Sequence, residues 1–281
     1  MRKAIEYILH MRPLAQLVTM IPFALGYLLS GARNIGEFVF GAFVWLVLLN
    51  AGTVAFNSYY DKDDGPINFL SRPPKATKGL LLFSWALKLC GLLLAAFINH
   101  DFLLLYALSV ILSVLYSHSF FRLKTKYGMD LLINMVGYGL MTPLAGWFLS
   151  GNHLNIKFVF AGLIGVFFMG AVVPLTQIFQ YEREKRSGET GFTVLVGVPI
   201  ALFTSIVLFS AGNFVAMFFI LAYDLPFLLF LAYCAIALVM YCHLHHWFRH
   251  FRVLNAIKEL YKTYGYAAAG GIIFALSLIF L

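Results

Sequence analysis

The chain has 281 residues, of which 62% are hydrophobic and only 11% are charged, and its formal net charge is +8. A water-soluble domain of this length needs a larger charged surface, so the composition excludes an ordinary soluble protein. Apolar stretches of roughly 18 or more residues recur along the whole sequence, and each can cross a hydrocarbon core of about 30 Å. We therefore expect an all-α polytopic membrane protein in which residues 1–281 form one transmembrane domain.

Nine transmembrane helices are predicted from the apolar stretches and the breaks between them. In chain order they cover residues 13–31, 37–60, 79–98, 102–118, 129–150, 157–180, 193–221, 226–247 and 264–281. We expect a bend or break in the seventh helix, because Pro199, Gly212 and Asn213 interrupt it. Residues 243–262 mix Trp, Phe and Leu with Arg and His, which is typical of an amphipathic segment at the membrane interface.

Lysine and arginine are divided unevenly between the two sides of the membrane in this arrangement. If the N-terminus is cytoplasmic, 17 of the 20 basic residues lie on the cytoplasmic side, and the exceptions are Arg33, Lys88 and Lys157. Such a division supports nine spans with the even-numbered loops in the cytoplasm. We expect a multi-pass protein of a bacterial inner membrane, surrounded by lipid and with no nucleic acid as a partner.

A polar sequence stands at the cytoplasmic end of the second predicted helix, where Asn57 is followed by Asp61, Asp63 and Asp64. If the helix continues to this point, Asn57, Asp61 and Asp64 are spaced i, i+4 and i+7 and share one face. An amide and two carboxylates suit a hard divalent cation such as Mg²⁺, which prefers oxygen ligands and shares them with phosphate. The alternative is a solvated loop start that is capped by aspartate.

Two basic loops lie on the same side of the membrane as these carboxylates, one after the second helix and one after the fourth. A group of cations suits a polyanion such as a diphosphate. Any single Lys or Arg could instead anchor the protein at lipid headgroups. The candidate side chains are Arg72, Lys75 and Lys78 in the first loop, and Tyr116, Arg122 and Lys124 in and before the second.

A second polar segment follows the sixth predicted helix. Polar side chains at the end of a membrane helix are costly unless they face a cavity or a partner. In a continuous helix the four candidates here would share one face, at spacings of i, i+3, i+4 and i+7. Because both polar segments are cytoplasmic and lie near basic loops, we expect them to border one cavity. The four residues of the second segment are Gln177, Gln180, Tyr181 and Glu184.

At these residues the chain resembles the UbiA superfamily of intramembrane prenyltransferases. Asn57 and Asp61 match the first Asn/Asp-rich motif of that family, and Arg72-Pro73 matches the basic segment after it. Residues 116–124 match the family's loop after the fourth helix, through Tyr116, Ser117, Arg122, Leu123 and Lys124. The opening Arg12-Pro13 and the plan of nine helices also fit, so the resemblance spans nearly the whole chain.

The chain departs from the family pattern at both motifs. Gly65 stands where the last aspartate of the first motif is expected, so Asp64 must substitute for it. In the second motif Gln177 and Gln180 stand where the family has aspartates, which leaves Glu184 as the acidic ligand. Glutamine coordinates through its carbonyl oxygen but adds no negative charge, so a second Mg²⁺ would be held more weakly.

The resemblance implies a helical bundle with a cytoplasm-facing cavity. It also implies Mg²⁺-dependent transfer of a prenyl group from a prenyl diphosphate to a lipophilic acceptor, such as an aromatic ring. Asn57, Asp61, Asp64 and Glu184 are implied as catalytic residues, and these four together with Gln180 as ligands of Mg²⁺. The implied substrate-binding residues are Arg72, Lys75, Lys78, Tyr116, Arg122, Lys124, Gln177, Gln180 and Tyr181.

Other functions remain open from the sequence. The two glutamines also fit a descendant of the family that binds an isoprenoid without turning it over. Cyclisation of a prenyl diphosphate on the same scaffold is another alternative. A transporter is disfavoured, because the charged residues of the membrane segments, apart from Lys88, lie at one side of the membrane and not near its middle.

Overall fold

The computed structural model describes every residue except 1, 63–69 and 71–72. Its described residues include nine helices that are long and apolar enough to cross a membrane, which confirms the predicted all-α polytopic fold. Two spans are composite, Ile35–Asp61 and Met129–Leu149, and the first span, Lys3–Leu29, includes the short helix α1. The other spans are single helices, apart from the short final turn of the last one.

The elements follow one another in a simple order along the chain. The first five spans comprise α1 (Arg2–His10), α2 (Pro13–Leu29), α3 (Ile35–Ala42), α4 (Ala51–Asp61), α5 (Lys78–Ala95), α6 (His100–Ser117), α7 (Met129–Asn134) and α8 (Thr142–Leu149). The last four comprise α9 (Ile156–Ile178), α12 (Val198–Ala222), α13 (Phe227–His250) and α14 (Ala256–Ser277), with a final turn at Leu278–Phe280. Three short helices lie in the loops: Leu123–Thr125, α10 (Tyr181–Arg186) and α11 (Phe192–Val196).

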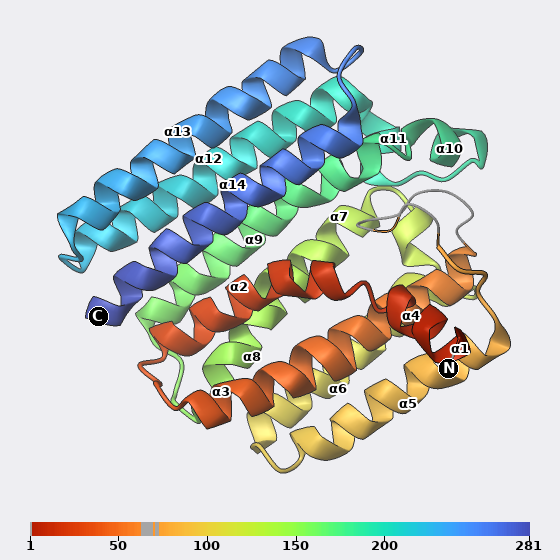
Figure 1. Ribbon diagram of the computed structural model, residues 1–281, viewed down its shortest axis with the longest axis horizontal. Helices are drawn as coiled ribbons and strands as arrows, with labels where there is room; N and C mark the ends of the chain where they lie inside the picture. Colours follow the sequence, from red (N-terminus) through yellow and green to blue (C-terminus); the bar gives the residue numbers. More distant parts are fainter. Residues whose placement is uncertain (1, 63–69, 71–72) are drawn as a thin grey trace.

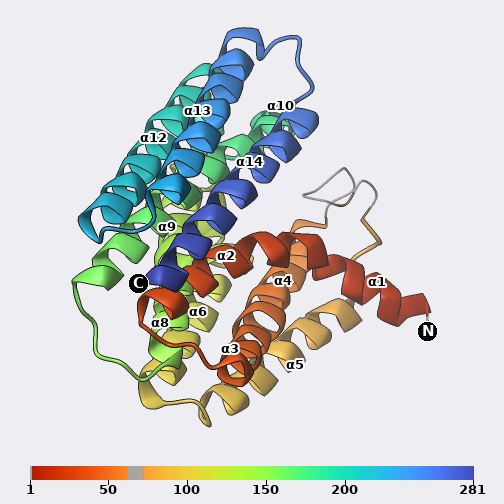
Figure 2. The ribbon, with the colours of Figure 1, turned by 60° about the vertical axis from the view of Figure 1, so that its left-hand side comes forward.

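The helices form two groups that meet along α2 and α9. Helices α9, α12, α13 and α14 run side by side in one group, and α3 to α8 make up the other (Figure 1). Seen from a second direction, α2 lies between α14 and the helix formed by α3 and α4 (Figure 2). This arrangement places the ends of α4, α6 and α9 near the start of α7, at one end of the bundle. We call this the polar end.

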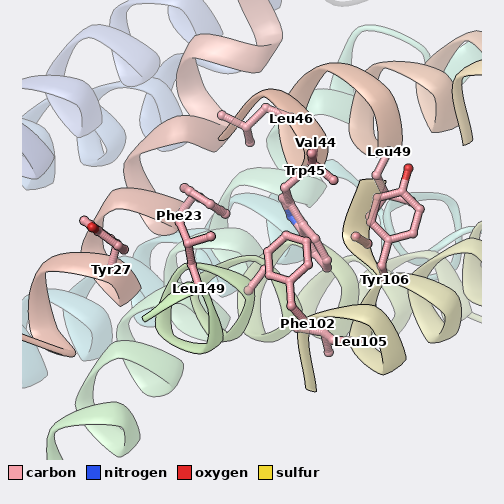
Figure 3. Close-up of a cluster of buried hydrophobic side chains, with 12 residues drawn as sticks. Phe23, Tyr27, Val44, Trp45, Leu46, Leu49, Phe102, Leu105, Tyr106 and Leu149 are labelled. Carbon is pink, nitrogen blue, oxygen red and sulfur yellow. The ribbon is translucent and has the colours of Figure 1, made fainter. Parts of the chain in front are cut away.

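Close contact between α2 and α8 depends on glycine. A Cβ atom at Gly26 would collide with the backbone of Pro143, and one at Gly146 would collide with the backbone of Phe23. In a bilayer the hydrophobic effect does not drive helices together, so small residues that permit close packing hold them. Beside this crossing, Trp45 makes edge contacts with Phe102 and Tyr106, at ring-centroid distances of 5.7 and 6.1 Å (Figure 3).

The second and fifth spans widen into π-helical turns in mid-membrane. These turns cover Phe43–Asn50 and Met135–Met141. A π-helical turn shifts the register of the side chains that follow and is frequent at functional sites. Trp45, Asn50 and Tyr138 come from these turns, and all three line the cavity that is described below.

The seventh predicted helix is interrupted, as expected, but at a different residue from those that suggested it. Helix α12 runs without a break past Gly212 and Asn213, and the interruption lies earlier, at Gly197, whose φ of 80° starts α12 ahead of Pro199. Both Gly212 and Asn213 are buried, where packing against neighbouring helices preserves the α-helix.

Residues 243–262 connect the last two spans, and their expected position at the membrane interface stays a prediction. They are the end of α13, a short turn and the start of α14. The His243 side chain lies between the two helices, with its Nδ1 3.5 Å from a carboxylate oxygen of Glu259 and its Nε2 3.0 Å from the Thr263 hydroxyl. His243 and Glu259 of this segment thus make a polar contact between the last two spans.

Candidate functional site

A cavity of about 730 Å³ opens between the two groups of helices. Side chains of α2, α4, α6, α7, α9 and α14 line it, together with the loops at the polar end. Away from that end its wall is mainly apolar and includes Leu25, Ile164, Phe168, Met169 and Phe274. The cavity therefore joins a charged region to an apolar interior.

Asn57 and Asp61 form the centre of the charged region. The Asn57 amide donates to Asp61 Oδ2 over 2.8 Å, one helical turn along α4. Lys124 reaches across from the loop after α6, and its ammonium donates to Asn57 Oδ1 over 2.9 Å and pairs with Asp61 Oδ1. Ser117, the last residue of α6, donates to the same Asn57 oxygen over 2.9 Å. Asn57 Oδ1 and Asp61 Oδ1 thus already hold one cation, the ammonium of Lys124.

Helix α4 ends sooner than the predicted common face of Asn57, Asp61 and Asp64 requires. Lys62 has a left-handed backbone with φ of 50°, so α4 stops at Asp61. The expected face of Asn57, Asp61 and Asp64 on one continuous helix is therefore wrong. Asp64 and Arg72 lie outside the described residues.

The loop after α6 borders the cavity with basic and aromatic side chains. Arg122 has a left-handed backbone with φ of 41° and pairs with Glu189 over 3.1 Å. Tyr116 is half-buried and lines the cavity, and its hydroxyl accepts a hydrogen bond of 3.1 Å from Asn134. Backbone hydrogen bonds join Thr125 and Gly128, at the end of this loop, to Thr190. The loop and the second polar segment therefore form one connected structure.

The second polar segment is not a continuous helix. Helix α9 ends at Ile178 and α10 begins at Tyr181, so the expected single face of Gln177, Gln180, Tyr181 and Glu184 is wrong. Three of the four nevertheless reach the cavity wall, and Tyr181 does not line it. The exposed Lys75 and Lys78 do not line it either.

The glutamines are engaged by neighbours. Gln180 accepts a hydrogen bond of 2.8 Å from Arg183. Gln177 donates to the carboxylate of Asp130, and its own oxygen accepts from the backbone N–H of Thr193 over 3.3 Å. Gln177 therefore joins α9 to the start of α7 and to α11.

Glu184 is half-buried and faces the cavity from α10. Burial, reinforced by the nearby carboxylate of Glu189, raises the pKa of Glu184 to about 7. Desolvation penalises the charged form of an acid, and a like charge adds to that penalty. Glu184 is thus poised to lose its proton when a cation approaches.

Sequence reasoning missed several polar residues that line the cavity, namely Arg12, Asp130, Asn134, Arg183 and Glu189. Asp130 gave the clearest signal, because it is an acidic residue at the start of a predicted transmembrane helix. Its partner Gln177 is 47 positions away, and no local pattern connects the two. Only the packing of α7 against α9 brings them together.

Comparison with known proteins identifies a family and a shared fold. The model of the UbiA prenyltransferase family matches residues 19–279. No curated protein sequence matches the chain.

Three solved structures resemble the chain over nearly its whole length. A UbiA homolog from Archaeoglobus fulgidus bound to GPP and Mg²⁺ has 20% identity and a TM-score of 0.71, covering 98% of this chain and 100% of that one. An apo UbiA homolog from Aeropyrum pernix K1 has 18% identity and a TM-score of 0.67, with coverages of 94% and 96%. A digeranylgeranylglyceryl phosphate synthase has 17% identity and a TM-score of 0.67, with both chains fully covered. At these identities the likeness shows the fold.

Proposed function

The chain belongs to the UbiA prenyltransferase family, and from this premise we propose that it transfers a prenyl group from a prenyl diphosphate to a lipophilic acceptor within the membrane. One observation carries the proposal. A single cavity joins the ionic cluster of Asn57, Asp61 and Lys124 to an apolar interior lined by Phe168 and Phe274. That shape and polarity suit an amphiphile with an anionic head and a hydrocarbon tail.

Mg²⁺ fits the polar end of the cavity. The oxygens of Asn57 and Asp61 hold the Lys124 ammonium, and oxygen donors of this kind suit a hard divalent cation. Among the described residues no three Asp, Glu, His or Cys side chains gather around one point. Mg²⁺ usually keeps water and takes phosphate oxygens alongside one or two carboxylates, so a diphosphate would complete its coordination. We assign Asn57, Asp61, Asp64, Gln180 and Glu184 as the candidate ligands.

When bound, Mg²⁺ supplies positive charge to the leaving diphosphate. The chain's own cations would add to it. Lys124 and Arg122 reach the cavity from the loop after α6, where each is now paired with a carboxylate. We propose that diphosphate oxygens take over part of these pairings, while Tyr116 borders the head group. Arg72, Lys75 and Lys78 would add positive charge that attracts the polyanion.

The apolar part of the cavity protects the reacting carbon. Cleavage of an allylic diphosphate leaves positive charge on the prenyl carbon, and water would trap it. The wall of Leu25, Phe168, Met169 and Phe274 excludes water, and aromatic faces stabilise positive charge without reacting. The acceptor then forms the new bond at that carbon and loses a proton to water or to the released diphosphate, which carries away the electron pair of the broken bond.

The orientation of the protein follows from the same proposal. The polar end would face the cytoplasm, where prenyl diphosphates are soluble, in agreement with the uneven division of Lys and Arg. The whole chain would act as a single transmembrane domain around one cavity.

Turnover in lipid nanodiscs tests the proposal. Purified protein is incubated with geranyl, farnesyl and geranylgeranyl diphosphate, Mg²⁺ and a lipophilic extract of the host. Released diphosphate is measured, and products are followed by mass spectrometry. We expect Mg²⁺-dependent release with a new prenylated mass, both lost in Asp61→Ala. Release with a cyclised hydrocarbon product would assign a cyclase, and binding without release for every substrate and extract would assign a non-catalytic isoprenoid-binding protein.

A further inference from the structure

Asp130 differs from other acidic residues at the cavity in the partners that hold it. It is the second residue of α7, it is 1% exposed, and it lines the cavity wall. Asp61 and Glu189 pair with Lys124 and Arg122. The Asp130 carboxylate instead accepts hydrogen bonds from the Gln177 amide and, over 2.9 Å, from the backbone N–H of Phe192. Both of these partners from other helices are neutral donors.

These two partners mark the base of one loop. Gln177 is in the last turn of α9, and Phe192 is the first residue of α11. The intervening residues, 178–191, contain α10 and Glu184 at the polar end of the bundle (Figure 1). One carboxylate therefore binds both ends of the loop that presents the second polar segment to the cavity.

The hydrogen bonds at this base form a connected chain from Asp130 through Gln177 and Thr193 to Pro174. Gln177 donates its N–H to Asp130 and accepts at its oxygen from the Thr193 N–H, 3.3 Å away. Thr193 in turn donates its hydroxyl to the Pro174 carbonyl over 3.3 Å. A carboxylate only accepts, whereas an amide both donates and accepts. With amides at both positions 130 and 177, two N–H donors would face each other at one of these contacts. With carboxylates at both positions, the two negative charges would repel each other.

We propose that Asp130 and Gln177 form a carboxylate–amide clamp that holds α10 and Glu184 against the cavity. Asp130 is then a positioning residue for the second polar segment. Gln177 holds the base of that segment and does not contact the diphosphate or its cation. The link to prenyl diphosphate binding rests on the proposed function, whereas the clamp itself rests on the contacts alone.

Exchanging the two groups tests the clamp with little change in shape. Asp130→Asn leaves two amides in contact, and Gln177→Glu leaves two carboxylates in contact. The double variant Asp130→Asn/Gln177→Glu restores one carboxylate and one amide in reversed positions. In this variant the amide at position 130 can donate to the carboxylate at position 177, and its oxygen can still accept from the Phe192 N–H. The other carboxylate oxygen at position 177 can accept from the Thr193 N–H.

Two measurements on the full-length protein in nanodiscs report the result. The first is the unfolding temperature without ligand, and the second is Mg²⁺-dependent binding of a non-hydrolysable geranyl thiodiphosphate. We expect each single variant to lower the unfolding temperature and to weaken binding about tenfold, the effect of one unsatisfied buried polar group. The double variant should recover both measurements to within about twofold of the wild-type affinity.

A control variant has the same net charge as the exchanged pair. In Asp130→Asn/Gln180→Glu the carboxylate stands beside Arg183 rather than at the clamp. We expect its unfolding temperature to stay as low as that of Asp130→Asn. Recovery here would show that net charge alone matters and would overturn the clamp.

The remaining outcomes separate the two claims. If the exchanged pair unfolds no later than the single variants, the clamp is wrong. If it recovers stability but not binding, while the wild type binds, then Asp130 or Gln177 contacts the ligand directly and the positioning role is wrong. If stability recovers and even the wild type does not bind the analogue, the clamp is supported and the proposed function fails.

Discussion

At the scale of single residues, the polar end depends on side chains that share partners. Asn57 Oδ1 accepts from both Ser117 and Lys124, and Asp61 pairs with the same lysine and with the Asn57 amide. Such a network holds its members in place before a ligand arrives. Asp61 supplies the negative charge of this network, so the consequences of its removal can be stated.

Asp61→Asn should lower Mg²⁺-dependent diphosphate release about a hundredfold, the usual scale for losing one preorganised electrostatic group at a reacting centre. The variant keeps the shape of the side chain but loses the charge that would hold the cation. Release assayed in nanodiscs at saturating prenyl diphosphate measures the change.

Asp101→Asn is the matched control for this variant. Asp101 is an exposed aspartate in the first turn of α6, at the end of that helix opposite Ser117. The same substitution there should leave release unchanged. Equal losses at Asp61 and Asp101 would contradict the assignment of the site.

Glu184 makes ligand binding depend on pH. With a pKa of about 7, its carboxyl is mostly neutral at pH 6 and mostly charged at pH 8. We expect Mg²⁺-dependent binding of geranyl thiodiphosphate to tighten over this interval. The ligand titrates as well, so the comparison is with Glu184→Gln, whose profile should be flatter. Identical profiles for the two proteins would remove Glu184 from the site.

Without ligand, the free energy of unfolding should change with pH in the opposite direction from ligand affinity. A carboxyl whose pKa is raised on folding binds more protons in the folded state, so stability falls as the pH rises from about 4.5 to about 7. Glu184→Gln should remove that part of the pH dependence of the unfolding temperature.

At the scale of elements, sequence reasoning succeeded where hydrophobic length alone decides. Each predicted span overlaps a span of the structure, because about 20 apolar residues are needed to cross the bilayer whatever surrounds them. It failed where tertiary contacts decide. The helix break before Tyr181 is such a place, because Gln177 is held by Asp130 and Thr193 from other elements. The seventh span stays helical at Gly212 because neighbouring helices pack against the buried α12 there.

Packing of α2 against α8 offers a test at this scale. A Cβ at Gly146 would collide with the carbonyl oxygen of Phe23, which cannot move without displacing α2. We expect Gly146→Ala to lower the unfolding temperature in nanodiscs by several degrees and to reduce ligand binding, because α2 forms one wall of the cavity.

Gly265→Ala is the control for this substitution. A Cβ at Gly265, within α14, would meet no atom within 4 Å. The exchange should leave stability unchanged or raise it, since alanine is favoured over glycine in a helix by ~1 kcal/mol. A similar fall in unfolding temperature for both variants would show that the close contact between α2 and α8 does not require glycine at position 146.

At the scale of the whole molecule, the cavity arises because two groups of helices meet along α2 and α9 (Figure 2). The sequence predicted that both polar segments border one cavity, and the structure places Asn57, Asp61, Gln177, Gln180 and Glu184 on its wall. It did not predict the contribution of α7. Asp130 joins the site through the order of helices in space, which hydrophobic patterns along one chain do not encode.

Mapping a bound prenyl diphosphate tests the central claim most directly. A diazirine-tailed analogue is photolysed with the protein in nanodiscs, with and without Mg²⁺, and labelled residues are identified by mass spectrometry. We expect Mg²⁺-dependent labelling of the apolar cavity wall on α9 and α14, around Phe168 and Phe274, which excess diphosphate suppresses. Labelling confined to exposed positions such as Leu238 of α13, unaffected by Mg²⁺ or diphosphate, would contradict the account.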